Sequence, residues 1–403
     1  MSDSSARSAQ FIEQEDHYGA HNYHPLDVVI TRGEGVYLWD VDGNRYMDFL
    51  AAYSAVNQGH NHPRIAQAMI QQCQQLSLTS RAFRNDQFPP LLEKLCRLTG
   101  FDKALLMNSG AEAVETAIKA CRKWGYERKG IAEGKAEIIV FEGNFHGRTT
   151  TIVGFSTDPS SYSGFGPITP GFRICPYGDL ESLCELVSPN TCAILVEPIQ
   201  GEGGIIVPPK GFLKGIRELC DDHRILLITD EIQSGLGRTG RLFAFEHEGV
   251  RPDGATIGKA LSGGFYPISA FLASKEVMSV FTPGIHGSTF GGNPLACAVA
   301  SAALDVIVDE QLVEHSSELG AYLLQRIRNI KSPHIKEVRG AGLWVGIELL
   351  PQAGGARRFC EALQHEGLLC KETHTHTIRL APPLVITQEE LDWAIGKLQK
   401  VMG

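Results

Sequence analysis

The amino-acid sequence predicts an α/β protein with a mainly parallel central sheet in a large domain and a smaller α+β domain. Short apolar, partly β-branched runs alternate with helical segments between residues 108 and 260. This alternation is typical of a parallel sheet covered by helices. Beyond Gly292 the pattern changes to two long helices followed by isolated strands, which indicates a separate lobe. We therefore expect an N-terminal segment at 1–55 that packs with the small domain, a large domain at 56–292 and a small domain at 293–403.

The first part of the chain predicts a hairpin and a helix. Val36–Trp39 and Tyr46–Leu50 are strand-like, and the connection between them ends in an Asp-Gly step at Gly43, which favours a tight turn. Residues 53–63 are too rich in Gly, Asn and His for a regular element. A helix is predicted at 64–76, because its apolar residues recur on one face.

The remaining elements follow from the spacing of apolar residues. The predicted strands are 137–141, 193–196, 225–229, 255–257, 345–349 and 377–380. The predicted helices are the stretch after Ala111 as far as Trp124, then 211–221, 294–309 and 312–330, and one between the last two strands.

Composition and charge exclude several classes of protein. The net charge is −9, from 37 basic and 46 acidic residues, and no basic stretch favours nucleic acid or an anionic membrane. The ten cysteines show no CxxC pair, which indicates free thiols in a reducing compartment. The serine-rich first ten residues resemble neither a secretory signal nor a transit peptide, and no apolar run is long enough to span a bilayer. We expect a cytoplasmic protein.

Two strand ends carry the residues on which the functional hypothesis depends. Asp230 follows the apolar run 225–229, and Lys259 follows 255–257. Ligands of open α/β sheets bind outside the carboxyl ends of the strands, so the two side chains could face one bound molecule. A carboxylate and an amine suit pyridoxal phosphate, because a lysine forms a Schiff base with its aldehyde and an acid keeps its ring nitrogen protonated.

Each of these residues also has an ordinary explanation. Most lysines are solvated, and an Asp at a strand end often caps the next helix. Lys259, however, lies beside Ile257 and Leu261, which are unusual neighbours for a solvated charge. A phosphate-binding P-loop is excluded, because the glycine spacing is wrong and Ala260 stands where Ser or Thr is required.

The entry to the helix after Ala111 is a candidate phosphate site. Asn108-Ser-Gly-Ala111 places small residues at a helix N-terminus, whose backbone N–H groups and dipole attract anions. Ser109 has an equally simple role as the residue that caps this helix. The sequence leaves both interpretations open.

Four further residues attract notice at loops and strand ends. Phe145 could cover a flat ring, and Arg148 could hold a carboxylate with two hydrogen bonds. Glu202 lies in a glycine-rich loop, and Arg379 interrupts an apolar run. Each of the charged residues, taken alone, is equally explained as a routine charge.

Two pairs of histidines have an H-x-H spacing, His60 with His62 and His374 with His376. No acidic or thiol ligand has a matching spacing, and Pro63 follows His62 in a predicted turn. We therefore expect no metal site.

Six segments in order along the chain resemble the class III pyridoxal-phosphate aminotransferases. They are Asn108-Ser-Gly-Ala-Glu-Ala113, Asn144-Phe-His-Gly-Arg-Thr149, Glu197-Pro-Ile-Gln-Gly-Glu202, Asp230-Glu-Ile-Gln-Ser-Gly235, Ile257-Gly-Lys-Ala-Leu261 and His286-Gly-Ser-Thr-Phe-Gly-Gly-Asn-Pro294. Four more are similar to the ornithine aminotransferases within that class: Ala20-His-Asn-Tyr-His-Pro25, Ser54-Ala-Val-Asn-Gln-Gly59, Thr79-Ser-Arg-Ala-Phe83 and Ile378-Arg-Leu-Ala-Pro-Pro383. The resemblance implies the fold-type-I architecture and a homodimer with shared active sites.

The resemblance also implies roles for individual residues. Lys259 would bind the cofactor and move a proton between it and the substrate carbon, and Asp230 would pair with the pyridinium nitrogen. The other cofactor contacts would be Phe145 on the ring, Gln233 at the phenolic oxygen, Ser109, Gly110 and Ala111 at the phosphate, and Thr289 at the phosphate from the other subunit. The far end of the substrate would meet Tyr23, Tyr53 and Arg148.

Glu202 and Arg379 should then form a gate. Ornithine donates its terminal amine, so its carboxylate lies near Arg148 and an arginine beside the ring needs another partner, because a buried unpaired guanidinium is costly. Glutamate donates an amine next to a carboxylate, which requires Arg379 to be free. We therefore predict a Glu202–Arg379 salt bridge that closes for one half-reaction and opens for the other.

The expected activity moves the δ-amino group of L-ornithine to a 2-oxo acid such as 2-oxoglutarate, giving glutamate 5-semialdehyde and glutamate, between arginine and proline metabolism. The alternative is a relative acting on acetylornithine, 4-aminobutyrate or the lysine ε-amine, because Ser109, Gly203 and Ser234 stand where ornithine-specific members often carry Thr, Ala and Thr. The segments with Tyr23 and Tyr53 favour ornithine. A non-catalytic protein that kept the fold is more remote, since Lys259 and Asp230 are retained.

Overall fold

The computed structural model describes residues 6–403, and its centre is a seven-stranded sheet in the order β4-β10-β9-β8-β7-β5-β6. The strands are β4 (Lys103–Met107), β5 (Glu137–Phe141), β6 (Phe172–Cys175), β7 (Thr191–Val196), β8 (Leu226–Asp230), β9 (Gly254–Ile257) and β10 (Ser269–Ala273). β10 pairs antiparallel with β4 and β9, and the other pairings are parallel, so the predicted mainly parallel sheet is confirmed.

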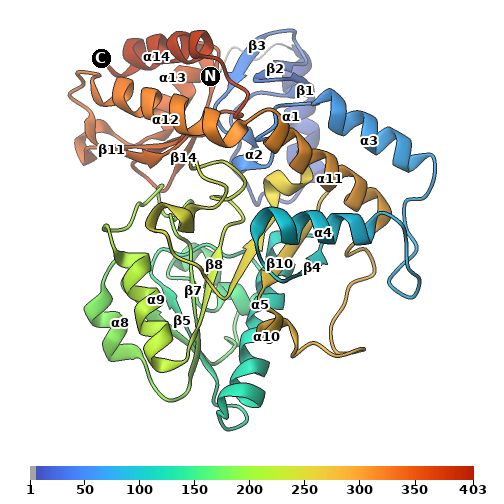
Figure 1. The fold of residues 1–403 in the computed structure, drawn as a ribbon. Coiled ribbons are helices and arrows are strands. Elements are labelled where there is room, and N and C mark those ends of the chain that lie inside the picture. Colours follow the sequence, from blue (N-terminus) through green and yellow to red (C-terminus); the bar gives the residue numbers. More distant parts are fainter. Residues whose placement is uncertain (1–5) are drawn as a thin grey trace.

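Alternation along the central strands divides the sheet's apolar side chains between two cores. Ile139, Ile194 and Leu227 face one cluster of buried residues, which also contains side chains of α8 and α9. Their chain neighbours Ile138 and Ile228 face a second cluster, built with α5. In Figure 1, α8 and α9 accordingly lie to one side of the strands and α5 and α10 to the other. This period of two fixes which residues at the strand ends share a face.

Three strands of this sheet were not predicted. β4 and β10 contain mainly alanine and leucine, and β6 is a short edge strand with an arginine, so none has the β-branched character that indicates a strand. Pairing with neighbours decides their conformation instead.

The helices and helical turns occupy the following ranges. The α-helices are α1 (Ala6–Tyr18), α2 (Ala51–Ser54), α3 (Pro63–Cys73), α4 (Phe88–Thr99), α5 (Gly110–Trp124), α6 (Thr150–Val153), α7 (Pro159–Tyr162), α8 (Leu180–Leu186), α9 (Phe212–His223), α10 (Lys275–Met278), α11 (Pro294–Asp309), α12 (Leu312–Arg328), α13 (Arg357–His365) and α14 (Gln388–Met402). The tighter or wider turns are η1 (Gly125–Lys129), η2 (Ala244–Glu248), η3 (Lys259–Ser262) and η4 (Pro351–Ala353). None of the helices in the described range 6–403 is long and apolar enough to cross a membrane.

The serine-rich N-terminus is partly described. Residues 1–5 of that stretch lie outside the described residues, and residues 6–10 begin α1, a helix that was not predicted.

Two smaller sheets complete the fold, and the first of them brings the two ends of the chain together. The first contains β1 (Ile30–Glu34), β2 (Tyr37–Asp40), β3 (Arg45–Asp48) and β13 (Leu368–Leu369), and the second contains β11 (Ile335–Ala341), β12 (Trp344–Leu349), β15 (Thr377–Leu380) and β14 (Lys371–Thr373). The predicted hairpin is the antiparallel pair β2–β3. Because β13 pairs in parallel with β3, the blue N-terminal strands lie beside the red C-terminal helices in Figure 1. The domain boundaries at 55 and 292 stay a prediction.

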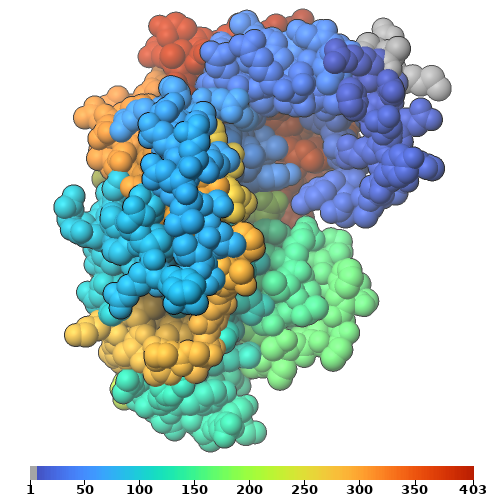
Figure 2. All heavy atoms as spheres, turned by 90° about the vertical axis from the view of Figure 1, so that its right-hand side faces the viewer, coloured from blue at the N-terminus to red at the C-terminus, as the bar shows by residue number. Residues whose placement is uncertain are grey.

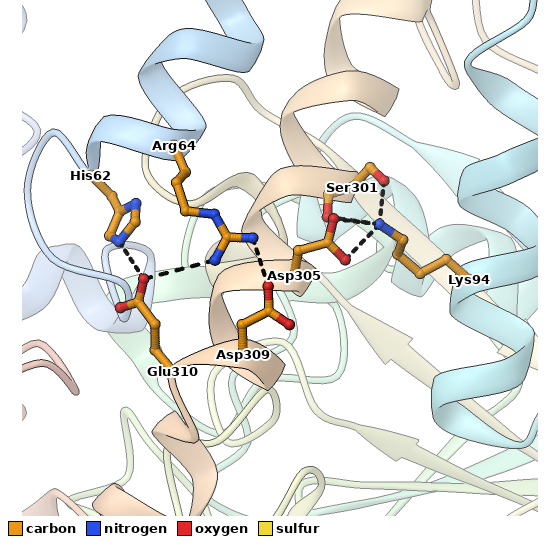
Figure 3. A network of polar contacts seen from close by, with 7 residues as sticks. All are labelled: His62, Arg64, Lys94, Ser301, Asp305, Asp309 and Glu310. Carbon is orange, nitrogen blue, oxygen red and sulfur yellow. Dashed lines mark hydrogen bonds and ion pairs between the residues drawn. The ribbon is translucent and has the colours of Figure 1, made fainter.

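Ion pairs fasten α11 to its neighbours (Figure 3). Arg64 on α3 donates to Asp309 at 2.6 Å, and Lys94 on α4 contacts Asp305 at 2.7 Å. These side chains are partly exposed, so each pair contributes little to stability by itself. They lie where α3 and α4 pack against the apolar helix α11.

A buried arginine joins the segment after β8 to the second smaller sheet and to the segment after α2. The Arg238 guanidinium donates to the carbonyls of Leu343 and Pro382 at 2.8 and 2.7 Å and to Asn57 Oδ1 at 2.5 Å. Burial lowers its pKa to about 9, and these acceptors compensate for the lost hydration. The loop that follows Asp230 is therefore held rigidly.

Backbone segments cross closely beside this arginine. A Cβ at Gly320 in α12 would lie 2.1 Å from the carbonyl carbon of Gly342, and a Cβ at Gly342 would lie 2.4 Å from that of Thr239. Glycine is required at this crossing because no side chain fits between the chains.

We predict that Gly320→Ala lowers the free energy of unfolding by about 1–3 kcal/mol or more, because the added methyl forces the α12 backbone away from Gly342. Gly396→Ala in α14 is the matched control. A Cβ there has nothing within 4 Å, and the change should leave stability equal or raise it by about 0.4–1 kcal/mol. Urea unfolding of both variants measures the difference, and equal midpoints would contradict the crossing.

Candidate active site

The two predicted strand ends meet at one cavity. Asp230 is the last residue of β8, and Lys259 follows the adjacent parallel strand β9 after a single glycine. Both side chains line a cavity of about 210 Å³ at the carboxyl edge of the central sheet. The juxtaposition expected from the sequence is thus present.

Six of the predicted site residues line this cavity, from three strand ends and one helix N-terminus. They are Gly110, Ala111, Phe145, Asp230, Gln233 and Lys259. The rest of the lining consists of His146, Gly147, Glu197, Ile199, Ile232 and Ser234.

Asp230 is surrounded by donors. Its Oδ2 lies 2.6 Å from His146 Nδ1, and its Oδ1 accepts from Thr256 Oγ1 and the Ile232 amide, both at 3.1 Å. Burial lowers the pKa of His146, but the hydrogen bond and charge of Asp230 outweigh it, and the net pKa is raised. Asp230 is therefore held in one orientation beside a ring that favours its negative charge.

Lys259 is only partly exposed, and its backbone lies in the left-handed region at φ 44°. Burial lowers the pKa of its amine to about 8, an effect that nearby Glu202 opposes and nearby Arg379 reinforces. The lowered pKa raises the share of neutral amine near neutral pH, and the neutral amine is the form in which a lysine attacks an aldehyde.

Small residues keep the N-terminus of α5 open to the cavity. A Cβ at Gly110 would lie 3.1 Å from the Ile232 side chain, and one at Gly147, where φ is 132°, would lie 2.9 Å from Ala111. Ser109 does not line the cavity: it caps α5, accepting from the Glu112 amide at 3.2 Å in a capping box. The capping interpretation of Ser109 is confirmed, and its predicted contact with a phosphate stays a prediction.

Sequence reasoning gave no role to two buried residues of this cavity. Glu197 accepts from the Phe145 and Gly201 amides at 3.0 and 3.3 Å, and burial raises its pKa to about 7. His146 and Glu197 both lie inside segments that carried the family resemblance, which was the available signal. They fix the backbone on either side of the cavity.

A second, larger cavity of about 560 Å³ shares Phe145 with the first. Tyr53, Arg148, Glu202 and Arg379 line it, together with a polar loop at 156–161 and the 372–374 segment. In Figure 2 a hollow opens between the dark blue N-terminal segment and the green loop, with red C-terminal residues at its floor. The structure thus gathers these four predicted residues beside the Lys259 cavity.

Glu202 and Arg379 are paired. Arg379 Nη1 and Nη2 donate to Glu202 Oε1 and Oε2 at 2.5 and 3.3 Å, and the guanidinium carbon lies 4.7 Å from the centre of the Tyr53 ring. Arg379 is only 2% exposed. Burial raises the pKa of Glu202, but the charge and hydrogen bond of Arg379 outweigh it, and the net pKa is lowered. The salt bridge predicted from the sequence is present, and its predicted opening stays a prediction.

Arg148 contrasts with Arg379. It is exposed, its guanidinium carbon lies 5.5 Å from the centre of the Phe145 ring, and no carboxylate of residues 6–403 lies within ion-pair distance of it. Arg148 is therefore available to an anion in the second cavity.

Tyr23 and Thr289 lie outside both cavities. Tyr23, 72% exposed, lines a third, mostly apolar cavity that shares Tyr53 with the second. Thr289 is exposed on the segment between α10 and α11 and lines none of these three cavities. Their predicted roles stay predictions.

The two histidines of the first H-x-H pair have other partners. His60 Nε2 lies 2.7 Å from Asp48, and His62 Nε2 lies 3.0 Å from Glu310. Within residues 6–403 no three His, Cys, Asp or Glu side chains gather in a way that could hold a metal ion.

Comparison with known proteins finds similarity to aminotransferases across nearly the whole chain. The model of the family described as "Aminotransferase class-III" matches residues 18–402. The chain is 59% identical to the ornithine aminotransferase of Bordetella pertussis, over 96% of this chain and 94% of that one.

Two solved structures are similar in fold. The ornithine aminotransferase of Toxoplasma gondii, which has PLP at partial occupancy in its active site, matches with a TM-score of 0.97 and 46% identity, over 98% of this chain and 94% of that one. The acetylornithine aminotransferase of Elizabethkingia anophelis matches with a TM-score of 0.89 and 51% identity, over 98% of each chain. With the cavity built around Asp230 and Lys259, these matches show that the chain belongs to the class III aminotransferases.

Proposed function

We propose that this enzyme transfers the δ-amino group of L-ornithine to a 2-oxo acid such as 2-oxoglutarate, giving glutamate 5-semialdehyde and glutamate. The observation that carries the proposal is the closed Glu202–Arg379 pair beside a free Arg148. With Arg379 paired with Glu202 near Lys259, Arg148 is the arginine of the second cavity that has no carboxylate partner in residues 6–403, and it lies beside the Phe145 ring. A substrate that presents its amine to Lys259 and its carboxylate at a distance suits this arrangement.

Class III aminotransferases use pyridoxal 5'-phosphate, and the cavity fits it. The glycines 110 and 147 leave room at the N-terminus of α5, where the backbone N–H groups of Gly110 and Ala111 would hold the phosphate. Gln233 Nε2 is buried and has no hydrogen-bond partner in residues 6–403, so it is a donor in need of an acceptor such as the phenolic oxygen. Phe145 would lie against the ring.

When bound, the cofactor supplies an aldehyde that combines with amines and a ring that withdraws electrons. Asp230 would hold the proton on the ring nitrogen, because His146 and Thr256 keep its carboxylate in place. Lys259 would carry the proton between carbon atoms, since its lowered pKa lets the amine accept and release protons near neutral pH.

Substrate exchange would use the two arginines in turn. Arg148 would bind the carboxylate of ornithine, with Tyr53 and Tyr23 at its α-amino end. For glutamate, the side-chain carboxylate would take Arg148 and the α-carboxylate would displace Glu202 from Arg379. Acetylornithine and related amines are the alternative substrates, since one structural relative is an acetylornithine aminotransferase.

We further propose a homodimer in the cytoplasm. Thr289 is exposed and lines none of the three cavities of its own chain, which suits a residue that serves the partner's phosphate. The ten free cysteines suit a reducing compartment.

A comparison of first half-reactions tests the substrate. The enzyme is mixed separately with ornithine, acetylornithine, 4-aminobutyrate and lysine, and the loss of the cofactor's absorbance is followed in a stopped-flow instrument. We expect ornithine to react fastest. A faster reaction with acetylornithine would transfer the proposal to that substrate, and no reaction with any amine would indicate a non-catalytic protein.

The lowered pKa of Lys259 predicts a pH dependence for cofactor capture. The amine is protonated below about pH 8 and neutral above it, so the rate at which cofactor-free protein captures pyridoxal phosphate should rise with pH, with a midpoint near 8. Stopped-flow absorbance measures this rate over a range of about four pH units, from roughly pH 6 to roughly pH 10, which includes the ordinary lysine pKa. A midpoint near the ordinary lysine pKa would contradict the burial of this amine.

The gate predicts opposite effects on the two half-reactions. Glu202→Ala frees Arg379, so the ratio of the glutamate half-reaction rate to the ornithine half-reaction rate should rise about tenfold or more. A tenfold change equals about 1.4 kcal/mol. Glu202→Gln is the control, because it removes the charge and retains a hydrogen-bond acceptor. An unchanged ratio in Glu202→Ala would show that the pair is not a gate.

A further inference from the structure

The segment that carries Thr289 is attached to α5 at two places. Near the start of the helix, Asn108 Nδ2 donates to Ser288 Oγ at 2.8 Å, and the same oxygen accepts from the Gly291 amide at 3.0 Å. Further along α5, His286 forms hydrogen bonds with Thr116 and Lys119. Thr289 stands between these attachments and is itself exposed.

The hydrogen bonds of His286 fix its tautomer. The Thr116 hydroxyl donates to the Glu112 carbonyl at 2.7 Å, so its oxygen can only accept from His286 Nε2, which lies 2.8 Å away. His286 Nδ1 must then accept from Lys119 Nζ at 2.9 Å. Burial and the Lys119 charge lower the pKa of His286, which keeps the ring neutral, while Glu112 opposes them. A neutral ring with its proton on Nε2 satisfies every partner.

Lys119 strengthens the attachment. Besides His286, its ammonium donates to the Ile285 carbonyl at 3.2 Å, so one side chain holds two successive residues of the segment. The His286 ring also lies 5.2 Å from the ring of Phe281, measured between centres. The segment leading to Thr289 is therefore held from both sides of His286.

From this geometry we propose that His286 is a positioning residue, which fixes Thr289 for the cofactor phosphate of the partner subunit. The proposal rests on the proposed function, in which Thr289 crosses to the partner. It gives α5 two tasks: its N-terminus faces the cavity of its own chain, and its second and third turns hold the segment that serves the other.

Mixed dimers test whether His286 acts on its own site or on the partner's. Lys259→Ala in one subunit of each dimer leaves a single site that binds the cofactor covalently and reports by absorbance. In the first dimer, His286→Ala is placed on the same chain as Lys259→Ala. In the second dimer, it is placed on the chain that retains Lys259. The two dimers have the same composition and differ only in which chain carries His286→Ala.

The affinity for pyridoxal phosphate, titrated by this absorbance, should fall about tenfold in the first dimer, the order expected when two hydrogen bonds are lost. It should be unchanged in the second. Equal loss in both dimers, loss only in the second, or no loss in either would overturn the proposal.

Two further comparisons keep the test decisive. Thr116→Val removes the acceptor of His286 with little change in shape, and Thr116→Ser retains it, so in the same dimers the valine variant should repeat the loss and the serine variant should not. If His286→Ala prevents dimers from forming, the Thr116→Val and Thr116→Ser variants decide the question alone.

Thr289→Ala separates the proposed phosphate contact from the positioning role of His286. If Thr289→Ala leaves the affinity unchanged, the proposed phosphate contact is wrong. Loss of affinity with Thr289→Ala but not with His286→Ala overturns the positioning role only.

Discussion

The site depends on the requirement that charges removed from water have partners. Asp230 lies against His146, Glu202 against Arg379, and Arg238 against three oxygen acceptors. Removing one member of a buried pair typically costs about 3–5 kcal/mol, because the other charge is left uncompensated. The pairs at the carboxyl edge of the sheet therefore hold in place the elements that carry them. The exception is a pair in which a substrate carboxylate can replace the acidic member. Glu202 and Arg379 line the second cavity, where a substrate carboxylate could take the place of Glu202.

The alternation of β8 separates two consecutive acids at its end. Asp230 faces the cavity, whereas Glu231 accepts from the Ala244 and Phe245 amides, both at 3.0 Å, at the start of η2. Burial raises the pKa of Glu231 to about 7. A one-residue shift in register would exchange the two carboxylates, so the pairing of β8 with β9 is what assigns the cavity to Asp230.

Much of the fold was predictable, because β-branched strands such as β5 and β8 and the amphipathic helix α5 have patterns that local chemistry dictates. Strands β4 and β10 were not, since their alanines and leucines are equally compatible with a helix. At the site, Asp230 and Lys259 were found because both end strands. Arg238 gave no local signal: its acceptors lie 105 and 144 residues further along the chain and 181 residues before it, and only the folded structure brings them together.

Tyr53 shows how the N-terminal strands shape the site. Residues 51–54 form a left-handed turn with φ between 46° and 72°, a conformation that costs roughly 1–2 kcal/mol for each L-residue. Asp48, at the end of β3, accepts from the Leu50 and Ala51 amides at 2.7 and 3.0 Å and is itself held by His60 at 2.7 Å. These bonds offset part of the strain and leave the Tyr53 ring over Arg379. Strained backbone of this kind persists only where its surroundings determine it, so His60, which belongs to an H-x-H spacing in the sequence, instead pairs with Asp48 and helps to place a ring that lines the second cavity.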